Sequence, residues 1–248
     1  MNIPADWIVP DWPAPQCVRA LVTTRLGGFS NGPYASFNLG DRVGDDASLV
    51  RQNRKRLCGF LPGEPMWLKQ VHGSEVANAD AMHGTAETDA SVARKVNNIC
   101  AILSADCLPL LLCDADGSVV AAAHCGWRGL VAGIIENTVI AMRVVPQSLL
   151  AYLGPGISSK AYLVGADVRA AFLRDDASAR QAFAANAPGK WHADLYLLAR
   201  QRLKRLGVEK IYGGNFCTHT DSARFYSHRR DGNTGRMASL IWLEEKSK

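Results

Sequence analysis

The chain has 248 residues, of which 48% are hydrophobic and 21% charged, and it carries a formal net charge of +5. This composition is typical of a globular protein with a large core and excludes a low-complexity or disordered chain. The chain has no run of 18 or more apolar residues, and its start lacks the basic and apolar regions of a signal peptide. We therefore expect a cytoplasmic protein that does not enter the membrane.

Short apolar runs rich in Val, Ile and Leu, bounded by Gly, Pro, Asn or Asp, predict strands along most of the chain. In chain order, these runs are 18–24, 66–71, 99–103, 108–113, 119–124, 149–153, 162–164, 208–212 and 237–243. The turn sequence at 114–117 ends in Gly117 and predicts a hairpin, which would bring Cys107 and His124 towards the same end of adjacent strands.

Longer stretches predict four helices, at 46–60, 130–144, 167–174 and 193–206. Asp194 near the start of the last helix and Gly207 just beyond its end are expected to cap it. Strands interrupted by a few helices, with hairpin and crossover connections mixed, predict an α+β fold. Nothing in the sequence marks a linker or a repeat, so we expect a single domain over 1–248.

The densest basic segment, 51–56, falls within the first predicted helix. No aromatic residue is interleaved with these charges, as a surface for single-stranded nucleic acid would require. We interpret the segment as a solvated helix face, with attraction of an anionic substrate as the alternative. We expect no nucleic-acid partner.

Three separate segments each offer one metal ligand: His72, Cys107 and His124. Two imidazoles and one thiolate suit zinc, with a fourth position open for water or substrate. The chain has no Cys-x-x-Cys or His-x-x-x-His pair, and the three ligands lie 35 and 17 residues apart, so only tertiary folding could bring them together. This spacing predicts a catalytic site and not a zinc finger. The alternative for each residue is a packed core position, which is also what we expect for Cys100 and Cys113.

Several short motifs resemble the YfiH/laccase-domain family of bacterial purine nucleoside phosphorylases, once called polyphenol oxidases, with a branch called peptidoglycan editing factor. They are TTRLGG at 23–28, FNLG at 37–40, QVH at 70–72, ADCLP at 105–109, HCGWRG at 124–129, LGPGI at 153–157 and GRMA at 235–238. The resemblance covers nearly the whole chain, from about Trp12 to Leu243. One departure is Cys125, where the family usually has a small residue such as Ala.

The resemblance implies a mixed β-sheet sandwich with helices packed outside, the broad fold of certain cysteine-dependent toxin deamidases. It implies Zn²⁺ as cofactor, and phosphorolysis of adenosine, inosine and methylthioadenosine with phosphate as co-substrate. It also implies deamination of adenosine at the same centre.

Arginines are the natural ligands for an incoming phosphate, because their forked guanidinium groups match its oxygens. Arg25 and Arg128 are flanked by glycines that would let an anion approach the backbone, and Arg229 with Arg230 forms a second cationic spot. Each could instead be a structural ion pair or a surface charge. The aromatics Tyr34, Phe37 and Phe225 could stack on a purine, or could belong to the core.

Two aspartates are further candidates for the site. Asp106 directly precedes Cys107, so on an extended strand its side chain would point away from the thiolate. It would then orient another group or cap the backbone, while contact with the substrate, as a proton donor, is the alternative. Asp89 is a candidate for proton transfer or for supporting a metal ligand.

Other functions fit parts of the same pattern. Cys107 as nucleophile and His124 as base would make a metal-free hydrolase or amidase acting on a peptidoglycan precursor, and that dyad would not need His72. A copper-dependent polyphenol oxidoreductase needs several copper ions and more histidines than the six present, which include no His-x-His pair. A metal-binding module without catalysis is the remaining alternative.

Overall fold

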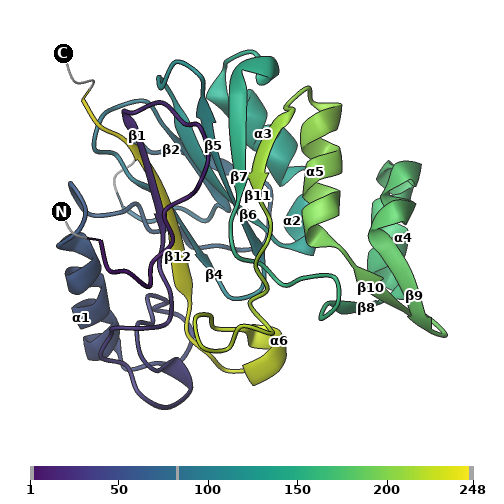
Figure 1. Ribbon diagram of the computed structural model, residues 1–248, viewed down its shortest axis with the longest axis horizontal. Coiled ribbons are helices and arrows are strands. Elements are labelled where there is room, and N and C mark those ends of the chain that lie inside the picture. The colour runs from purple at the N-terminus through teal and green to yellow at the C-terminus, as the bar shows by residue number, and fades with distance from the viewer. Residues whose placement is uncertain (1–2, 82–83, 246–248) are drawn as a thin grey trace.

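A computed structural model, which describes residues 3–81 and 84–245, has an α+β architecture with three β-sheets in the described part of the chain (Figure 1). The largest sheet has six strands in the order β11-β7-β5-β6-β3-β2. Their bounds are β2 (Val76–Asn78), β3 (Ala90–Ala93), β5 (Leu108–Asp114), β6 (Val120–Cys125), β7 (Leu149–Leu153) and β11 (Lys210–Gly213). The central strands β5, β6 and β7 pair antiparallel, whereas β11 pairs parallel with β7 and β2 pairs parallel with β3. The predicted mixed sheet is confirmed.

A second sheet packs face to face against the first and completes a sandwich. Its strands are β1 (Val18–Val22), β12 (Met237–Leu243) and β4 (Cys100–Ser104), in the order β1-β12-β4. Alternate residues of β5, such as Leu111 and Cys113, point into the layer between the sheets, where they join Ile102 and Ile241. Cys100 and Cys113 are fully buried there, as the sequence predicts.

Helices cover both outer faces of the sandwich (Figure 1). On the smaller sheet lies α1 (Ala47–Cys58), which begins where the Asp46 side chain accepts a hydrogen bond from the Ser48 N–H. On the larger sheet lie α2 (Trp127–Val131), α3 (Ile134–Met142) and α5 (Leu195–Arg205). Asp194 caps α5 by accepting from the Leu197 N–H, and Gly207 follows its end with a φ of 88°, so the predicted cap pair is confirmed.

The third sheet lies beside the sandwich at the right of Figure 1, together with α4 (Ala166–Asp175). It comprises β8 (Leu163–Gly165), β10 (Lys190–Ala193) and β9 (Phe183–Ala187) in the order β8-β10-β9. The short helix α6 (His228–Asp231) and the 3-10 turns η1 (Gly32–Tyr34), η2 (Pro146–Ser148) and η3 (Ala177–Ala182) complete the elements. No helix among the described residues is long and apolar enough to cross a membrane.

The strand predicted at 66–71 is wrong. Only Met66 forms a bridge, pairing with Cys100 of β4. At Gln70, the side chain makes the two backbone hydrogen bonds that a neighbouring strand would make. Its amide nitrogen donates to the Leu103 carbonyl and its oxygen accepts from the Leu103 N–H, both at 2.8 Å. A side-chain amide thus satisfies the edge of β4, and the backbone of 70–73 is free to turn towards the site.

The helix predicted at 130–144 is also wrong as a single element, because the chain forms α2 and α3 there. Gly133 between them has a φ of 89°, which interrupts a right-handed helix and which glycine adopts without a steric penalty. The strands β2, β3, β9 and β10 were not predicted. They are only three to five residues long and rich in alanine, which gives little periodic signal.

The antiparallel pairing of β5 and β6 positions the site. Leu108 at the start of β5 pairs with Cys125 at the end of β6, so Cys107 and His124 do lie at the same end of the sheet. The hairpin prediction is confirmed.

Candidate metal centre

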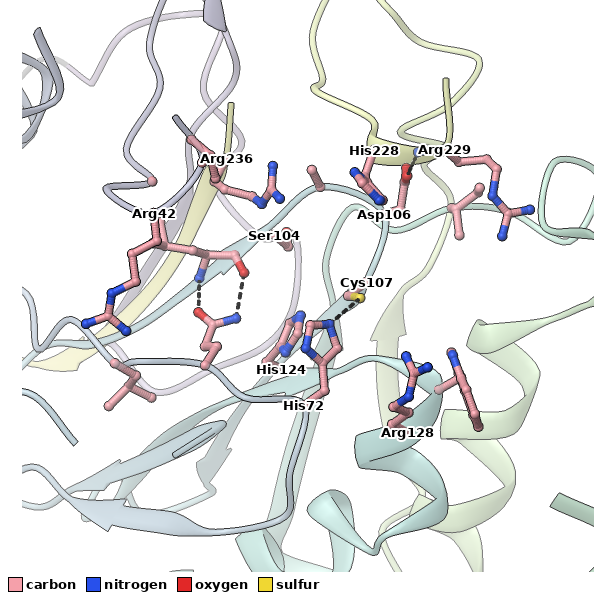
Figure 2. A pocket seen from close by; sticks show the side chains of 18 of the residues that line it. Arg42, His72, Ser104, Asp106, Cys107, His124, Arg128, His228, Arg229 and Arg236 are labelled. Carbon is pink, nitrogen blue, oxygen red and sulfur yellow. Dashed lines mark hydrogen bonds between the residues drawn. The ribbon is translucent and has the colours of Figure 1, made fainter. Parts of the chain in front are cut away.

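His72, Cys107 and His124 converge at one end of the sandwich (Figure 2). One potential ligand atom from each lies within 4.8 Å of the other two, and Cys107 Sγ is 3.9 Å from His72 Nε2. His124 is buried in the sheet, Cys107 is partly buried and His72 is exposed. The group therefore opens to solvent on the His72 side.

The donor set fits a metal ion. With zinc bonds of about 2.0–2.1 Å to nitrogen and about 2.3 Å to sulfur, tetrahedral ligand atoms lie roughly 3.3–3.6 Å apart. The observed spacing needs only small side-chain adjustments to reach that range. Three protein ligands that leave the solvent side open match catalytic zinc sites and not closed structural ones.

Asp89 organises two of the three potential ligands. Its carboxylate is fully buried and accepts hydrogen bonds from the backbone N–H groups of Val71, His72 and Gly73, at 2.7–3.0 Å. The same carboxylate is 2.9 Å from His124 Nδ1, which leaves Nε2 of that ring as the ligand atom. A carboxylate behind a histidine fixes its tautomer and orientation and makes it a better metal ligand. Between the two roles predicted for Asp89, this geometry favours support of a ligand.

The charges of these groups reinforce one another. Burial alone would raise the pKa of the Cys107 thiol, but His124 and His72 outweigh it and lower that pKa to about 6. Burial would lower the pKa of His124, while Cys107 and Asp89 raise it to about 9. For Asp89, burial opposes ionisation, but hydrogen bonds from His124 and the Gly73 N–H hold its pKa below the usual range. Cys107 is therefore a thiolate near neutral pH, as a metal ligand or nucleophile must be.

Backbone geometry brings the segments close together. His72 and Asp106 have φ values of 60° and 92°, a left-handed conformation that is costly for non-glycine residues and is often found at functional sites. A Cβ at Gly126 would lie 3.0 Å from Cys107 Sγ and 3.1 Å from His72 Cδ2. The glycine of the Gly-Trp-Arg-Gly motif thus allows the start of α2 to approach the cluster.

Asp106 lies in the turn between β4 and β5 and not on an extended strand. Its side chain is buried, with one oxygen accepting from Thr218 Oγ1 and the other from the Arg229 N–H, both at 2.6 Å. Ile157 N–H donates to its carbonyl at 2.9 Å. Asp106 therefore ties the Cys107 turn to the LGPGI segment and to the start of α6. It also lines the pocket, but both its carboxylate oxygens are already engaged.

A cavity of about 490 Å³ opens above the cluster. Its walls include Gln70, Leu103, Ser104, Trp127, Arg128, Ile157, Tyr162, His228, Arg229 and Arg236, with 40–43 at one end. Arg128 stacks on Trp127, and Arg229 lies over the Tyr162 ring and donates to the Leu163 carbonyl at 2.7 Å. The pocket therefore combines potential metal ligands, cations and two aromatic side chains.

Other predicted residues lie elsewhere. Arg25 does not line the pocket: it donates to the carbonyls of Ala35 and Ser222 and stacks on Tyr226, so its guanidinium holds loops together. Arg230 pairs with Asp231 and backbone carbonyls. The aromatics Tyr34, Phe37 and Phe225 also lie outside the lining, and the last two are core residues.

Several pocket residues were missed from the sequence, among them Trp127, Tyr162, Arg42, His228 and Arg236. Arg236 is part of the GRMA motif, which could have drawn attention to it, but Arg42 and His228 carry no comparable signal. The His228 Nδ1–H donates to the Gly232 carbonyl at 2.7 Å, which leaves Nε2 as the free ring nitrogen.

Cys125 does not take part in the site. It is fully buried on the helix-covered side of β6, and burial raises the pKa of its thiol. All seven cysteines are free thiols.

Comparison with known proteins gives a consistent picture. The family model described as multi-copper polyphenol oxidoreductase laccase matches residues 19–244. A purine nucleoside phosphorylase of Pseudomonas aeruginosa is 51% identical over 96% of this chain and 99% of its own length. The purine nucleoside phosphorylase YfiH of Escherichia coli is 49% identical over 95% and 98%.

Solved structures share the fold. A Neisseria meningitidis protein superposes with a TM-score of 0.94 at 50% identity, covering 97% of this chain and all of that one. YlmD from Geobacillus stearothermophilus has a TM-score of 0.88 at 29% identity, covering 99% and 98%.

Proposed function

Since this chain belongs to the multi-copper polyphenol oxidoreductase laccase family and its curated relatives are named purine nucleoside phosphorylases, we propose that it is a cytoplasmic, single-domain, zinc-dependent purine nucleoside phosphorylase. Adenosine, inosine and methylthioadenosine are its substrates, and it also deaminates adenosine. The observation that carries the proposal is the His72–Cys107–His124 group at the floor of an arginine-lined pocket.

Phosphorolysis breaks the bond between the base and the sugar carbon while a phosphate oxygen bonds to that carbon, giving a free purine and a pentose 1-phosphate. The protein must hold an anion, a flat base and a sugar in one geometry. Arg128 and Arg229 supply cations for the phosphate, and the Trp127 and Tyr162 rings offer faces on which a purine can stack.

The metal ligands occupy the centre of this arrangement. Zinc held by His72, Cys107 and His124 would polarise a substrate oxygen or lower the pKa of a water at its open position. Phosphorolysis and deamination then differ in which co-substrate the pocket holds: phosphate for the first and water for the second. Asp89 keeps His124 oriented in both reactions.

The family description refers to copper, and the set of potential ligands helps to decide between copper and zinc. Among the described residues, one group of three His, Cys, Asp or Glu side chains has metal-binding spacing. Multi-copper oxidation requires several copper sites, whereas one zinc ion would suffice to orient phosphate or to activate water. Elemental analysis of protein purified without added metal should give close to one zinc per chain. Copper in that position would contradict the proposal.

Incubation with adenosine, with and without phosphate, followed by separation of the products tests the activity. Adenine or hypoxanthine that appears only with phosphate is the expected result. Inosine alone would reduce the function to a deaminase, and no turnover of any purine nucleoside would contradict the proposal.

A second candidate, a hydrolase or amidase with Cys107 as nucleophile, is favoured by the lowered pKa of its thiol beside His124. Such an enzyme would act on a peptidoglycan precursor. It would keep its activity in chelator and after His72→Ala, because a Cys–His dyad needs no third ligand. The phosphorylase should lose its activity under both conditions.

A further inference from the structure

Arg236 presents a fixed and unpaired cation to the pocket. Its Nη1 donates to the carbonyls of Thr234 and Gly235 at 2.7 and 2.9 Å, which holds the guanidinium in place. Figure 2 shows this group turned towards the pocket, with His72 and Cys107 between it and Arg128. No carboxylate of the described residues forms an ion pair with it. Because a partly buried cation is costly without a counter-charge, an unpaired guanidinium here points to an anionic ligand.

The two aspartates of the pocket do not fill that role. Asp41 forms its ion pair with Arg54 at 3.4 Å, and Asp106 accepts hydrogen bonds from Thr218 and the Arg229 backbone. Against these two carboxylates, the lining has four arginines: Arg42, Arg128, Arg229 and Arg236. This excess of positive charge favours the binding of more than one anionic group in the cavity.

Two of the motifs that carry the family resemblance, FNLG at 37–40 and GRMA at 235–238, build this part of the wall, and the proposed phosphorolysis leaves both without a role. Asn38 Oδ1 accepts from the backbone N–H groups of Gly40 and Arg236, both at 2.9 Å. The Leu39 N–H donates to the Arg236 carbonyl. A Cβ at Gly40 would lie 2.8 Å from Arg236 Cγ, so the glycine makes space for the arginine stem. The FNLG and GRMA segments together therefore form a cradle that fixes the position of the Arg236 guanidinium.

We propose that Arg236 forms a second oxyanion subsite, which binds a phosphoryl group on the side of the pocket opposite Arg128. The group is either free orthophosphate or the phosphate ester of a nucleotide. The subsite rests on the proposed function, which supplies the purine nucleoside class. If the bound group is a phosphate ester, the subsite adds nucleoside monophosphates to the ligands that the pocket accepts.

The test compares Arg236→Gln and Arg236→Lys with a matched control, Arg200→Gln. Arg200 is also half-buried and also donates to backbone carbonyls, of Ile211 and Gly213, but it lies outside the pocket lining. Binding of inorganic phosphate, inosine and inosine 5′-monophosphate to the metal-loaded protein is measured by equilibrium dialysis, without turnover.

Loss of a charge-assisted contact to a phosphoryl group should weaken its binding about 10-fold to 100-fold. If the subsite takes free phosphate, Arg236→Gln weakens binding of orthophosphate. If it takes an ester, the variant weakens binding of the monophosphate and leaves orthophosphate unchanged. In either case inosine binds as before and Arg200→Gln has no such effect. Arg236→Lys keeps the charge but loses the fork, so its defect should be smaller.

Gly40→Ala tests the cradle without removing charge. The added methyl group displaces the Arg236 stem, so this variant should reproduce part of the Arg236→Gln defect on the same ligand.

Two results would overturn the subsite: unchanged binding of both phosphoryl ligands in Arg236→Gln, or an equal loss for inosine, which would mean that the arginine only shapes the pocket. Binding is measured without catalysis, so the two proposals can fail separately. Absence of phosphorolysis would contradict the proposed function, whereas the Arg236 subsite is contradicted only by the binding results above.

Discussion

Two buried aspartates fix different segments of the candidate site, and their partners differ. Asp89 binds the backbone of 71–73 and the His124 ring, so it acts directly on two of the candidate metal ligands. Asp106 binds Thr218 and the start of α6, so it acts on the wall where substrate would lie. In both cases one carboxylate gathers hydrogen-bond donors from distant segments and fixes them through charge-assisted bonds. Substitutions at Asp89 and Asp106 should therefore change metal affinity and the shape of the substrate-facing wall separately.

The largest effect is expected for Cys107→Ala, which removes the only thiolate from the ligand group. Zinc content measured by elemental analysis should fall close to zero, and phosphorolysis should disappear. The protein should remain folded, because a core of this size does not depend on the ion. Cys125→Ala is the matched control, since this thiol is buried away from the site and its loss should leave the metal bound. Full zinc in Cys107→Ala would refute the site.

Asp89→Asn should lower metal affinity or activity about 10-fold to 100-fold, as is typical for a group that orients a metal-bound histidine. Competition with a chromogenic chelator measures the affinity. Asp80→Asn is a suitable control, because Asp80 also accepts backbone N–H groups, from Arg94 and Lys95, but lies outside the pocket lining. Equal metal affinities in Asp89→Asn and Asp80→Asn would show that Asp89 has no more effect on the metal than a structural aspartate elsewhere.

Arg128→Ala should raise the Michaelis constant for phosphate or slow phosphorolysis by about one to two decades, the cost of roughly 1.5–3 kcal/mol for one charge-assisted contact. Deamination uses water and should suffer much less. Arg128→Lys should rescue only part of the activity, because it lacks the fork. If both reactions are damaged equally, Arg128 positions the purine and not the phosphate.

Asp106→Asn should have the smallest effect, a loss of about 2-fold to 10-fold in kcat/KM, because an amide oxygen can keep one of the two hydrogen bonds. Zinc content should be unchanged. Measuring kcat/KM and zinc content in both Asp106→Asn and Asp89→Asn therefore gives the sharpest contrast between the two aspartates. Loss of zinc from the Asp106 variant would show that the two sides of the site are not separable.

Local sequence determined the elements whose signals lie within a few residues. Asp46, Asp194 and Gly207 mark helix ends, because capping depends on immediate neighbours. The long apolar runs of β5 and β12 predict buried strands for the same reason. The candidate metal ligands were also identified from local context, since each of the three lies in a segment with a distinctive motif.

Only tertiary structure decided what joins those segments. Asp106 meets Thr218 and Arg229 across 112 and 123 residues of chain, and Asp89 meets His124 across 35. The same long-range packing placed Arg25 away from the pocket and Arg236 within it, and let a Gln70 side chain replace a strand. A residue type and its neighbours specify which bonds a side chain can make, but its partner is set by where the whole chain brings the two together.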